Sequence, residues 1–186
     1  MSAFPAELTG TWEIDSAHST VGFAAKHAVV ATTRGHFTEF SGGVTIDAAD
    51  PSASAAWLDI VASSLTTGNG QRDGHLLGPD FFDVENHPTI TFRSASVSVD
   101  GDEIVLDGDL TIRGVSRPVQ VRWEFGGVAA DPWGGVRTGF EGTATVNRKD
   151  WGLTWNVALE TGGFLVSDKI KLVLEIEAAK KTDPVD

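Results

Sequence analysis

Residues 103–125, EIVLDGDLTIRGVSRPVQVRWEF, carry the alternation that decides the fold. Apolar and polar residues alternate on both sides of a turn expected at Gly114-Val115-Ser116, so each half has one apolar and one polar face. The apolar faces are Ile104, Leu106, Leu110 and Ile112 before the turn, and Val119, Val121, Trp123 and Phe125 after it. This pattern predicts two antiparallel strands with one face in a core and the other in water.

The same alternation extends over most of the chain, for example in Thr20–His27. It changes parity within residues 34–46 and again within residues 89–99, which predicts a bend or bulge in each segment. Asp100-Gly101 is a strong hairpin signal. Eight or nine strands of this kind fall in the range where an antiparallel sheet closes around one ligand, so we expect an all-β barrel.

The chain of 186 residues fits one domain, and its 21 glycines and single methionine favour many short strands and turns. Residues 1–10 have no periodic pattern and are expected to form an N-terminal arm. Residues 180–186, which include Pro184, are expected to form a flexible tail. The predicted barrel domain is 11–179.

Composition also excludes several classes of protein. There is no cysteine, so disulfides and thiolate metal sites are absent. A formal net charge of -12 should repel nucleic acid and anionic membrane surfaces. No stretch approaches the roughly 20 apolar residues of a membrane span, and the N-terminus shows no secretory signal, so we expect a cytoplasmic protein without an integral membrane segment.

Residues 69–92 interrupt the strand pattern. Asn69 can cap a short helix that Gly78-Pro79 would end, and an Arg72-Asp73-x-His75 cluster lies within it. The cluster has three readings: an anion or head-group site, an acid–base pair, or a local ion pair that fixes the helix.

Inward parity, together with residues 69–92, marks side chains that would line the interior of a barrel. These side chains would either form a tunnel wall for an apolar ligand or fill the interior as a packed core, since the interior of a small barrel is often filled by its own side chains. The set is Phe23, Phe37, Leu76, Phe81, Phe82, Phe92, Leu110, Ile112, Val121, Trp123 and Phe140.

Arg148 falls at the same inward parity as the apolar residues of its strand, so it must reach water, pair with a neighbouring strand or meet a ligand anion. The five histidines lack metal-binding spacings, so no metal site is predicted. No nucleophile-elbow, Walker or Rossmann motif is present, and we predict no cofactor.

Five blocks in order resemble the YceI-like family of lipocalin-like, polyisoprenoid-binding proteins over nearly all of residues 8–178. They are TWEIDSAHSTVGFAAKH (11–27), RGHFTEFSG (34–42), SLTTGNGQRDGHLLGPDFFDVENHPTITFRS (64–94), GDLTIRGVSRPV (108–119) and NRKDWG (147–152).

The resemblance implies an extended lipocalin-like antiparallel barrel of about eight strands with one or two short helices. It further implies a long apolar tunnel that holds an isoprenoid or fatty chain without covalent chemistry, and it is compatible with a homodimer. Family members are often exported.

Two functions follow. The first is a carrier or store for a lipid or isoprenoid ligand, with Arg72, His75 and Arg148 as head-group candidates. The second is an enzyme acting on such a molecule, with Asp73 and His75 as the acid–base pair.

Overall fold

The computed structural model describes residues 4–182, which form one antiparallel sheet, one α-helix and five short 3₁₀ turns. The strands are β1 (Gly10–Ile14), β2 (Thr20–His27), β3 (Ala31–Phe37), β4 (Phe40–Ile46), β5 (Ala55–Val61), β6 (Leu65–Thr66), β7 (Thr89–Asp100), β8 (Glu103–Ile112), β9 (Val115–Ala130), β10 (Val136–Asn147) and β11 (Val166–Lys180). The helix is α1 (Gly70–Leu77), and the 3₁₀ turns are η1 (Ala6–Leu8), η2 (Ser16–His18), η3 (Pro51–Ala53), η4 (Ala62–Ser64) and η5 (Arg148–Trp151).

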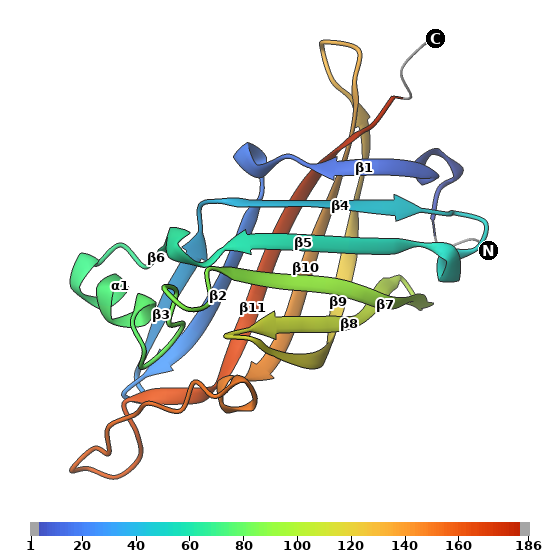
Figure 1. The fold of residues 1–186 in the computed structure, drawn as a ribbon. Coiled ribbons are helices and arrows are strands. Elements are labelled where there is room, and N and C mark those ends of the chain that lie inside the picture. Colours follow the sequence, from blue (N-terminus) through green and yellow to red (C-terminus); the bar gives the residue numbers. More distant parts are fainter. Residues whose placement is uncertain (1–3, 183–186) are drawn as a thin grey trace.

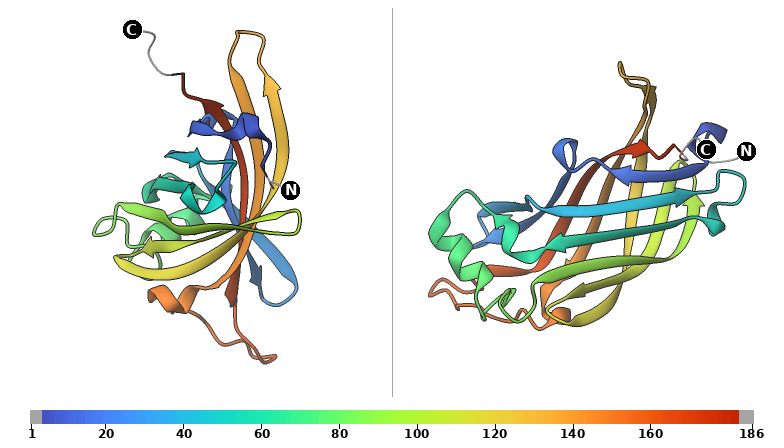
Figure 2. Two further views of the ribbon diagram at one scale, coloured as in Figure 1. Left: turned by 90° about the vertical axis from the view of Figure 1, so that its right-hand side faces the viewer. Right: turned by 45° about the horizontal axis from the view of Figure 1, so that its top comes forward.

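Eight strands close a barrel in the order β1-β4-β5-β7-β8-β9-β10-β11, with β11 pairing back onto β1 (Figure 1). The long β11 makes this possible because its two halves have different neighbours. Residues 178–180 pair with β1, whereas residues 166–175 pair with β2. From there β2, β3 and the two-residue β6 extend the sheet beyond the closed ring (Figure 2). The predicted all-β barrel is confirmed.

The two predicted changes of parity are real breaks in the sheet. Thr38 and Glu39 separate β3, which pairs with β2 and β6, from β4, which pairs with β1 and β5. The register of β7 against β8 shifts between Ser94 and Ser96. Each break re-aims the strand, as closing a barrel requires.

The predicted hairpins form, with small shifts in their turns. Gly101 and Asp102 connect β7 and β8, and Gly101 has the positive φ of +64° that a tight hairpin needs. Arg113 and Gly114 make the next turn, so Val115 and Ser116 already belong to β9.

Helix α1 begins where the capping residue predicts. The Oδ1 of Asn69 accepts a hydrogen bond from the backbone N–H of Arg72, and the helix ends at Leu77, before Gly78. It lies at one end of the barrel, beside β3 and β6 (Figure 1).

At the barrel end near β1, the segment expected to be an N-terminal arm packs into the structure from Phe4 onward. Phe4, Leu8 and Trp12 are buried, and the indole N–H of Trp12 donates to the carbonyl of Leu8. This segment therefore belongs to the core at that end of the barrel.

At the other terminus, β11 runs to Lys180, so the tail expected from residue 180 begins inside a strand. Residues 183–186 of that tail lie outside the described part of the chain. Between residues 4 and 182 no helix is long and apolar enough to cross a membrane.

Candidate functional site: an apolar cavity inside the barrel

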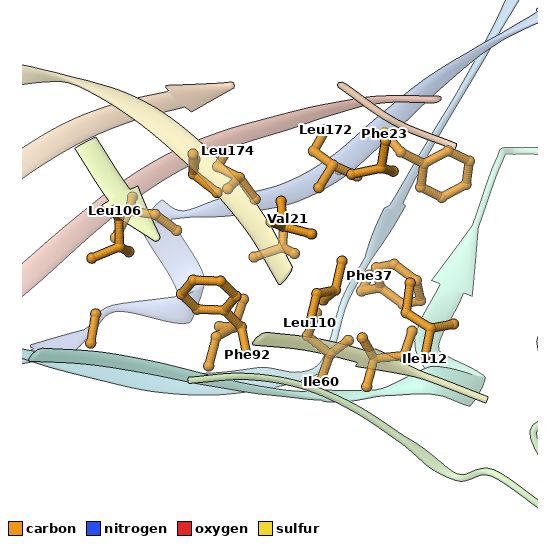
Figure 3. Close-up of a pocket in the computed structure, with 18 of the residues that line it drawn as sticks. Val21, Phe23, Phe37, Ile60, Phe92, Leu106, Leu110, Ile112, Leu172 and Leu174 are labelled. Carbon is orange, nitrogen blue, oxygen red and sulfur yellow. The ribbon is translucent and has the colours of Figure 1, made fainter. Parts of the chain in front are cut away.

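A cavity of about 280 Å³ lies inside the barrel, and all eight strands of the closed ring contribute to its wall (Figure 3). Almost every side chain on the wall is apolar. Within residues 4–182, the exceptions are the hydroxyl of Ser54 and the guanidinium of Arg148. Ligand sites are typically concave and mostly apolar, with a few placed polar groups, and this cavity has that character.

All eleven side chains predicted to line a tunnel are on this wall. Figure 3 shows Phe23 of β2, Phe37 of β3, Phe92 of β7 and Leu110 and Ile112 of β8 pointing into the same space. Their role in binding a ligand stays a prediction. Sequence reasoning did not select several further wall residues, although those on strands β5, β8 and β11 share the same inward parity; they include Ile60, Leu106, Leu172, Leu174 and Ile176.

Glycines explain how the interior stays open although it contains large aromatic rings. A Cβ atom on Gly142 would lie 2.5 Å from the ring of Trp123, and one on Gly35 would lie 2.6 Å from that of Phe23. Each ring therefore lies against bare backbone of the neighbouring strand. A side chain in place of either glycine would push the ring toward the cavity.

The interior is not filled by its own side chains. Leu172, Leu174 and Ile176 of β11 face inward, yet they are only partly buried because they border the cavity. A fully packed core, the alternative reading of the apolar set, would leave no such space, although Phe37, Phe81, Leu110 and Val121 of the set are themselves buried in a core cluster.

Arg148 is the one charged side chain on the cavity wall among the described residues, and it is only 5% exposed. It begins η5, directly after β10. Its Nη1 donates to the carbonyls of Leu153 and Trp155 at 2.7 and 2.9 Å, and its Nε donates to that of Ser167 at 3.0 Å. Its Nη2 has a longer contact of 3.5 Å with a carboxylate oxygen of Asp168.

Burial lowers the pKa of the Arg148 guanidinium, but an arginine stays charged in proteins. Of the outcomes open for this residue, the structure shows neighbouring backbone carbonyls as its main partners. Its Nη2 is the part of the guanidinium that is least satisfied by the protein.

Arg72 and Asp73 do not reach the cavity wall. Arg72 is exposed, and its guanidinium donates to the hydroxyl and carbonyl oxygens of Thr67. Asp73 accepts hydrogen bonds from the hydroxyl and backbone N–H of Thr67 and from the hydroxyl of Thr66, and these bonds lower the pKa of its carboxyl group. Both residues thus fasten α1 to the adjacent strand β6 and the residue after it.

His75 has separate partners. Its Nε2 lies 2.9 Å from a carboxylate oxygen of Asp80, and its ring makes edge contacts with Phe81 and Trp155. The enzyme hypothesis required Asp73 and His75 to pair with each other, and they do not. On α1, Leu76 is the residue that lines the cavity.

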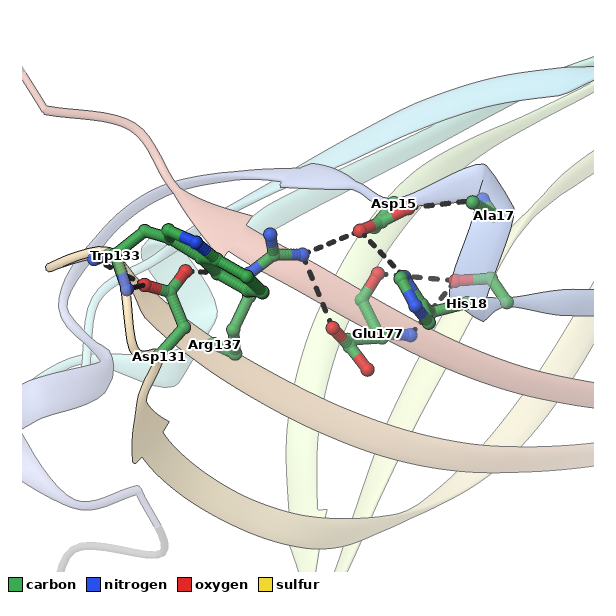
Figure 4. Close-up of polar contacts among 9 residues, drawn as sticks. Asp15, Ala17, His18, Asp131, Trp133, Arg137 and Glu177 are labelled. Atoms are coloured by element: carbon green, nitrogen blue, oxygen red, sulfur yellow. Dashed lines mark hydrogen bonds and ion pairs between the residues drawn. The ribbon is translucent and has the colours of Figure 1, made fainter.

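A cluster of charged residues stabilises the closure of the barrel near the junction of β1 and β11 (Figure 4). Arg137 of β10 donates to Asp15, Glu177 and Asp131, with its shortest contact to Asp15 at 2.5 Å. His18 also lies 3.0 Å from Asp15. Asp15, His18 and Glu177 bring three ligand-type atoms within 4.8 Å of one another, a grouping that the sequence did not reveal. The Arg137 guanidinium already supplies the positive charge between the two carboxylates.

We expect this cluster to make stability depend on pH in acid. The hydrogen bond from Arg137, followed by that from His18, lowers the pKa of Asp15 from 3.8 to about 2. Because the pKa of Asp15 is lower in the folded state than in the unfolded state, its carboxylate stabilises the fold fully at any pH above the unfolded pKa. This contribution is lost as pH falls from about 4 toward 2. The loss should be up to about 2 kcal/mol, measured as the free energy of unfolding in urea across this range.

The R137Q variant should lose most of this extra acid sensitivity and be less stable than the wild type at neutral pH. The control is R122Q, which removes an exposed contact with Asp100 and Glu103 on the outer surface. If the free energy of unfolding of R137Q differs from that of the wild type by the same amount at every pH from 5 to 2, the cluster does not cause the acid dependence of stability.

Comparison with known proteins agrees with this architecture. The family model described as YceI-like domain matches residues 12–178. A UPF0312 protein of Pseudomonas aeruginosa is 35% identical over 164 residues, which cover 88% of this chain and 83% of that protein. Protein YceI of Escherichia coli O157:H7 is 34% identical over 164 residues, with the same two coverages.

Solved structures share the fold. The YCEI protein of Campylobacter jejuni superposes with a TM-score of 0.72 at 30% identity, covering 84% of this chain and 90% of that one. BcnA of Burkholderia cenocepacia gives 0.75 at 24% identity, with coverages of 88% and 98%. A polyisoprenoid binding domain from Saccharophagus degradans gives 0.64 at 16% identity, with coverages of 91% and 98%. From the match of the family model and of these relatives over most of its length, the chain belongs to the YceI-like domain family.

Proposed function

We propose that this protein binds one long-chain apolar or amphiphilic molecule inside the barrel and carries or stores it without chemical change. The ligand class is a polyisoprenoid, an isoprenoid quinone or a fatty-acid derivative. The observation that supports this most directly is the cavity, whose wall offers hydrophobic contact along its whole length and very few polar groups.

The shape of the wall favours a chain over a compact ligand. Ile104 and Ile112 both line the cavity from β8, and an extended strand between them spans about 26 Å. Each CH₂ group that moves from water into such a site contributes about 0.8 kcal/mol. A long tail therefore gains enough free energy to bind without a strong polar contact.

The polar end of the ligand is proposed to lie near Arg148. Of the three head-group candidates, Arg72 and His75 are held by Thr67 and Asp80 and are not on the cavity wall, whereas Arg148 is. The Nη2 group of Arg148 could donate to a carbonyl, carboxylate or phosphate oxygen. One fold neighbour is described as a polyisoprenoid binding domain, which is the ligand class that this wall chemistry suits.

The enzyme hypothesis has no comparable support. Its acid–base pair is not assembled, because Asp73 is bound by Thr66 and Thr67 and His75 by Asp80.

Native mass spectrometry of protein purified without detergent tests the binding function. We expect an adduct whose mass corresponds to a lipid or isoprenoid, and we expect delipidated protein to bind a fluorescent long-chain fatty acid or an isoprenoid alcohol at one site. Protein that is consistently free of adducts and binds neither probe would contradict the proposal.

A further inference from the structure

An exposed apolar patch lies at one end of the molecule, on two neighbouring loops. The first connects β2 to β3 and exposes Val29 and Val30, whose exposed fractions are 70% and 87%. The second precedes β11 and exposes Val157 and Phe164, at 46% and 59%. We call these four residues the apolar tip. Large side chains gathered in this way on a surface mark an interaction site more often than isolated ones do.

Contacts between the two loops fix them to each other, so the apolar tip is a defined surface of the fold. The backbone N–H of Ala28 donates to the carbonyl of Leu165 at 2.8 Å, and a methyl group of Val29 lies beside Gly163. The side chain of Asn156 hydrogen-bonds both backbone groups of Val166 and closes the second loop.

Val29 is also an unusual residue for its position. Its φ is +69°, and that of Ala28 is +48°, in the left-handed region that β-branched residues avoid. Glycine or asparagine would satisfy this turn with less strain. The valine side chain contributes little burial in return, which is consistent with a role at the surface.

Positive charge borders the apolar tip. On the outer face of the sheet, Lys171 pairs across to Ala24, and Ala24 pairs to Arg34. Lys26 and Lys169 lie two residues further along on the same face, and all four basic side chains are exposed. We call Lys26, Arg34, Lys169 and Lys171 the basic face.

This local charge is opposite in sign to that of the whole chain. Residues 20–37 contain no Asp or Glu, although the chain has 26 of them against 14 Lys and Arg. The second loop contributes Glu160, and Asp168 is engaged by Arg148 and Lys149. Charges elsewhere on the barrel are screened beyond a Debye length of about 8–10 Å at physiological salt. Within residues 20–37 and 157–171, the four Lys and Arg of the basic face therefore outnumber the two acidic residues, Glu160 and Asp168.

The apolar tip is also close to the cavity. Ala25 and Val166 line the cavity, and they flank the point where β2 and β11 lead into the two loops. Ala25 is only four residues from Val29. The cavity wall thus extends to the strand positions from which the two loops begin.

We propose that the apolar tip and the basic face together dock the protein on an anionic lipid bilayer. The valine and phenylalanine side chains enter the boundary between head groups and acyl chains, while the lysines and Arg34 contact lipid phosphates. A bilayer suits this surface because two exposed apolar loops with positive charge on one adjoining face need no complementary groove. Exchange of ligand with the membrane at this end would rest on the proposed binding function, but docking itself does not.

Co-sedimentation of the delipidated protein with vesicles tests the docking. Vesicles of phosphatidylcholine with phosphatidylglycerol should bind the protein, pure phosphatidylcholine should bind it about tenfold more weakly or worse, and added salt should reduce the difference. The V30D/F164D variant should lose at least about tenfold in vesicle affinity, and K26Q/K171Q should lose a similar factor. These four side chains are exposed, so the fold should be retained.

Matched controls lie at the other end of the barrel. The W133S variant removes an 87% exposed tryptophan from the tip of the β9–β10 hairpin, far from the apolar tip in both views of Figure 2. K181Q removes a lysine that pairs with Glu13. Both should bind anionic vesicles like the wild type.

The proposal is overturned if anionic vesicles are not bound, or if W133S and K181Q reduce binding while the tip variants do not. Sedimentation that reveals a dimer abolished by V30D/F164D would instead assign the surface to a second copy of the chain. Because the protein is delipidated, vesicle binding succeeds or fails independently of whether a ligand occupies the cavity.

Discussion

Replacing Leu174 by tryptophan should reduce the affinity for a fluorescent long-chain fatty acid by about a thousandfold. Leu174 lies on β11 and faces Phe92 and Leu110 across the cavity (Figure 3). The larger indole would occupy the middle of the lumen. Excluding about five methylene units from the wall removes ~4 kcal/mol of binding free energy, and this corresponds to about three decades in Kd.

The control for this prediction is V173W, one residue earlier on the same strand. Val173 pairs with Gly22 and Thr143 on the outer face of the sheet, so the same bulky side chain would project away from the cavity. V173W should keep wild-type affinity. Equal affinities for L174W and V173W would show that the probe binds outside the barrel, and a titration followed by fluorescence distinguishes the two cases.

The second large effect is expected on stability, from R148M. Methionine supplies a long apolar side chain but removes the donor to the carbonyls of Leu153, Trp155 and Ser167, of which the first is in a buried hydrogen bond and the other two are in partly buried ones. Because each unsatisfied buried group costs about 1–3 kcal/mol, we expect the free energy of unfolding to fall by at least about 3 kcal/mol. Urea denaturation measures this loss, and limited proteolysis should show earlier cleavage between residues 152 and 166.

K149M is the matched control. It removes a neighbouring positive charge that contacts the same Asp168, but from an exposed side chain at the surface. Its effect should stay below about 1 kcal/mol. If R148M is as stable as K149M yet binds a fatty acid more weakly than the corresponding alcohol, Arg148 serves the ligand head group and is not required for the fold.

Much of the fold could be predicted from residues 103–125 and the strands that repeat their pattern. Alternation with period two is a local property, since successive side chains of any strand point to opposite faces. It therefore identified the wall residues Phe23, Phe92 and Leu110 without knowledge of their neighbours. The Asn69 cap and the breaks near residues 38 and 95 were also visible, because caps, bends and bulges leave local signals.

The polar candidates were less predictable, because a charged side chain reaches whatever partner the fold brings near it. Arg72 and His75 are close in sequence to Leu76, but only Leu76 faces the cavity. Arg148 was expected to need a partner. Its main partners are backbone carbonyls, which every residue has, so the residue types in the sequence do not identify them.

An all-β barrel with an apolar interior thus follows from the amino-acid sequence, because strand periodicity and hydrophobicity are properties of short segments. The open interior becomes visible in the folded barrel alone, since it depends on rings lying against glycines of neighbouring strands, as Trp123 does against Gly142. The folded barrel also brings Val29 beside the loop of Phe164 and sets the basic face next to them. These contacts depend on the pairing of β2 with β11, two strands far apart in the sequence, and the alternation within a strand does not identify its partner strand.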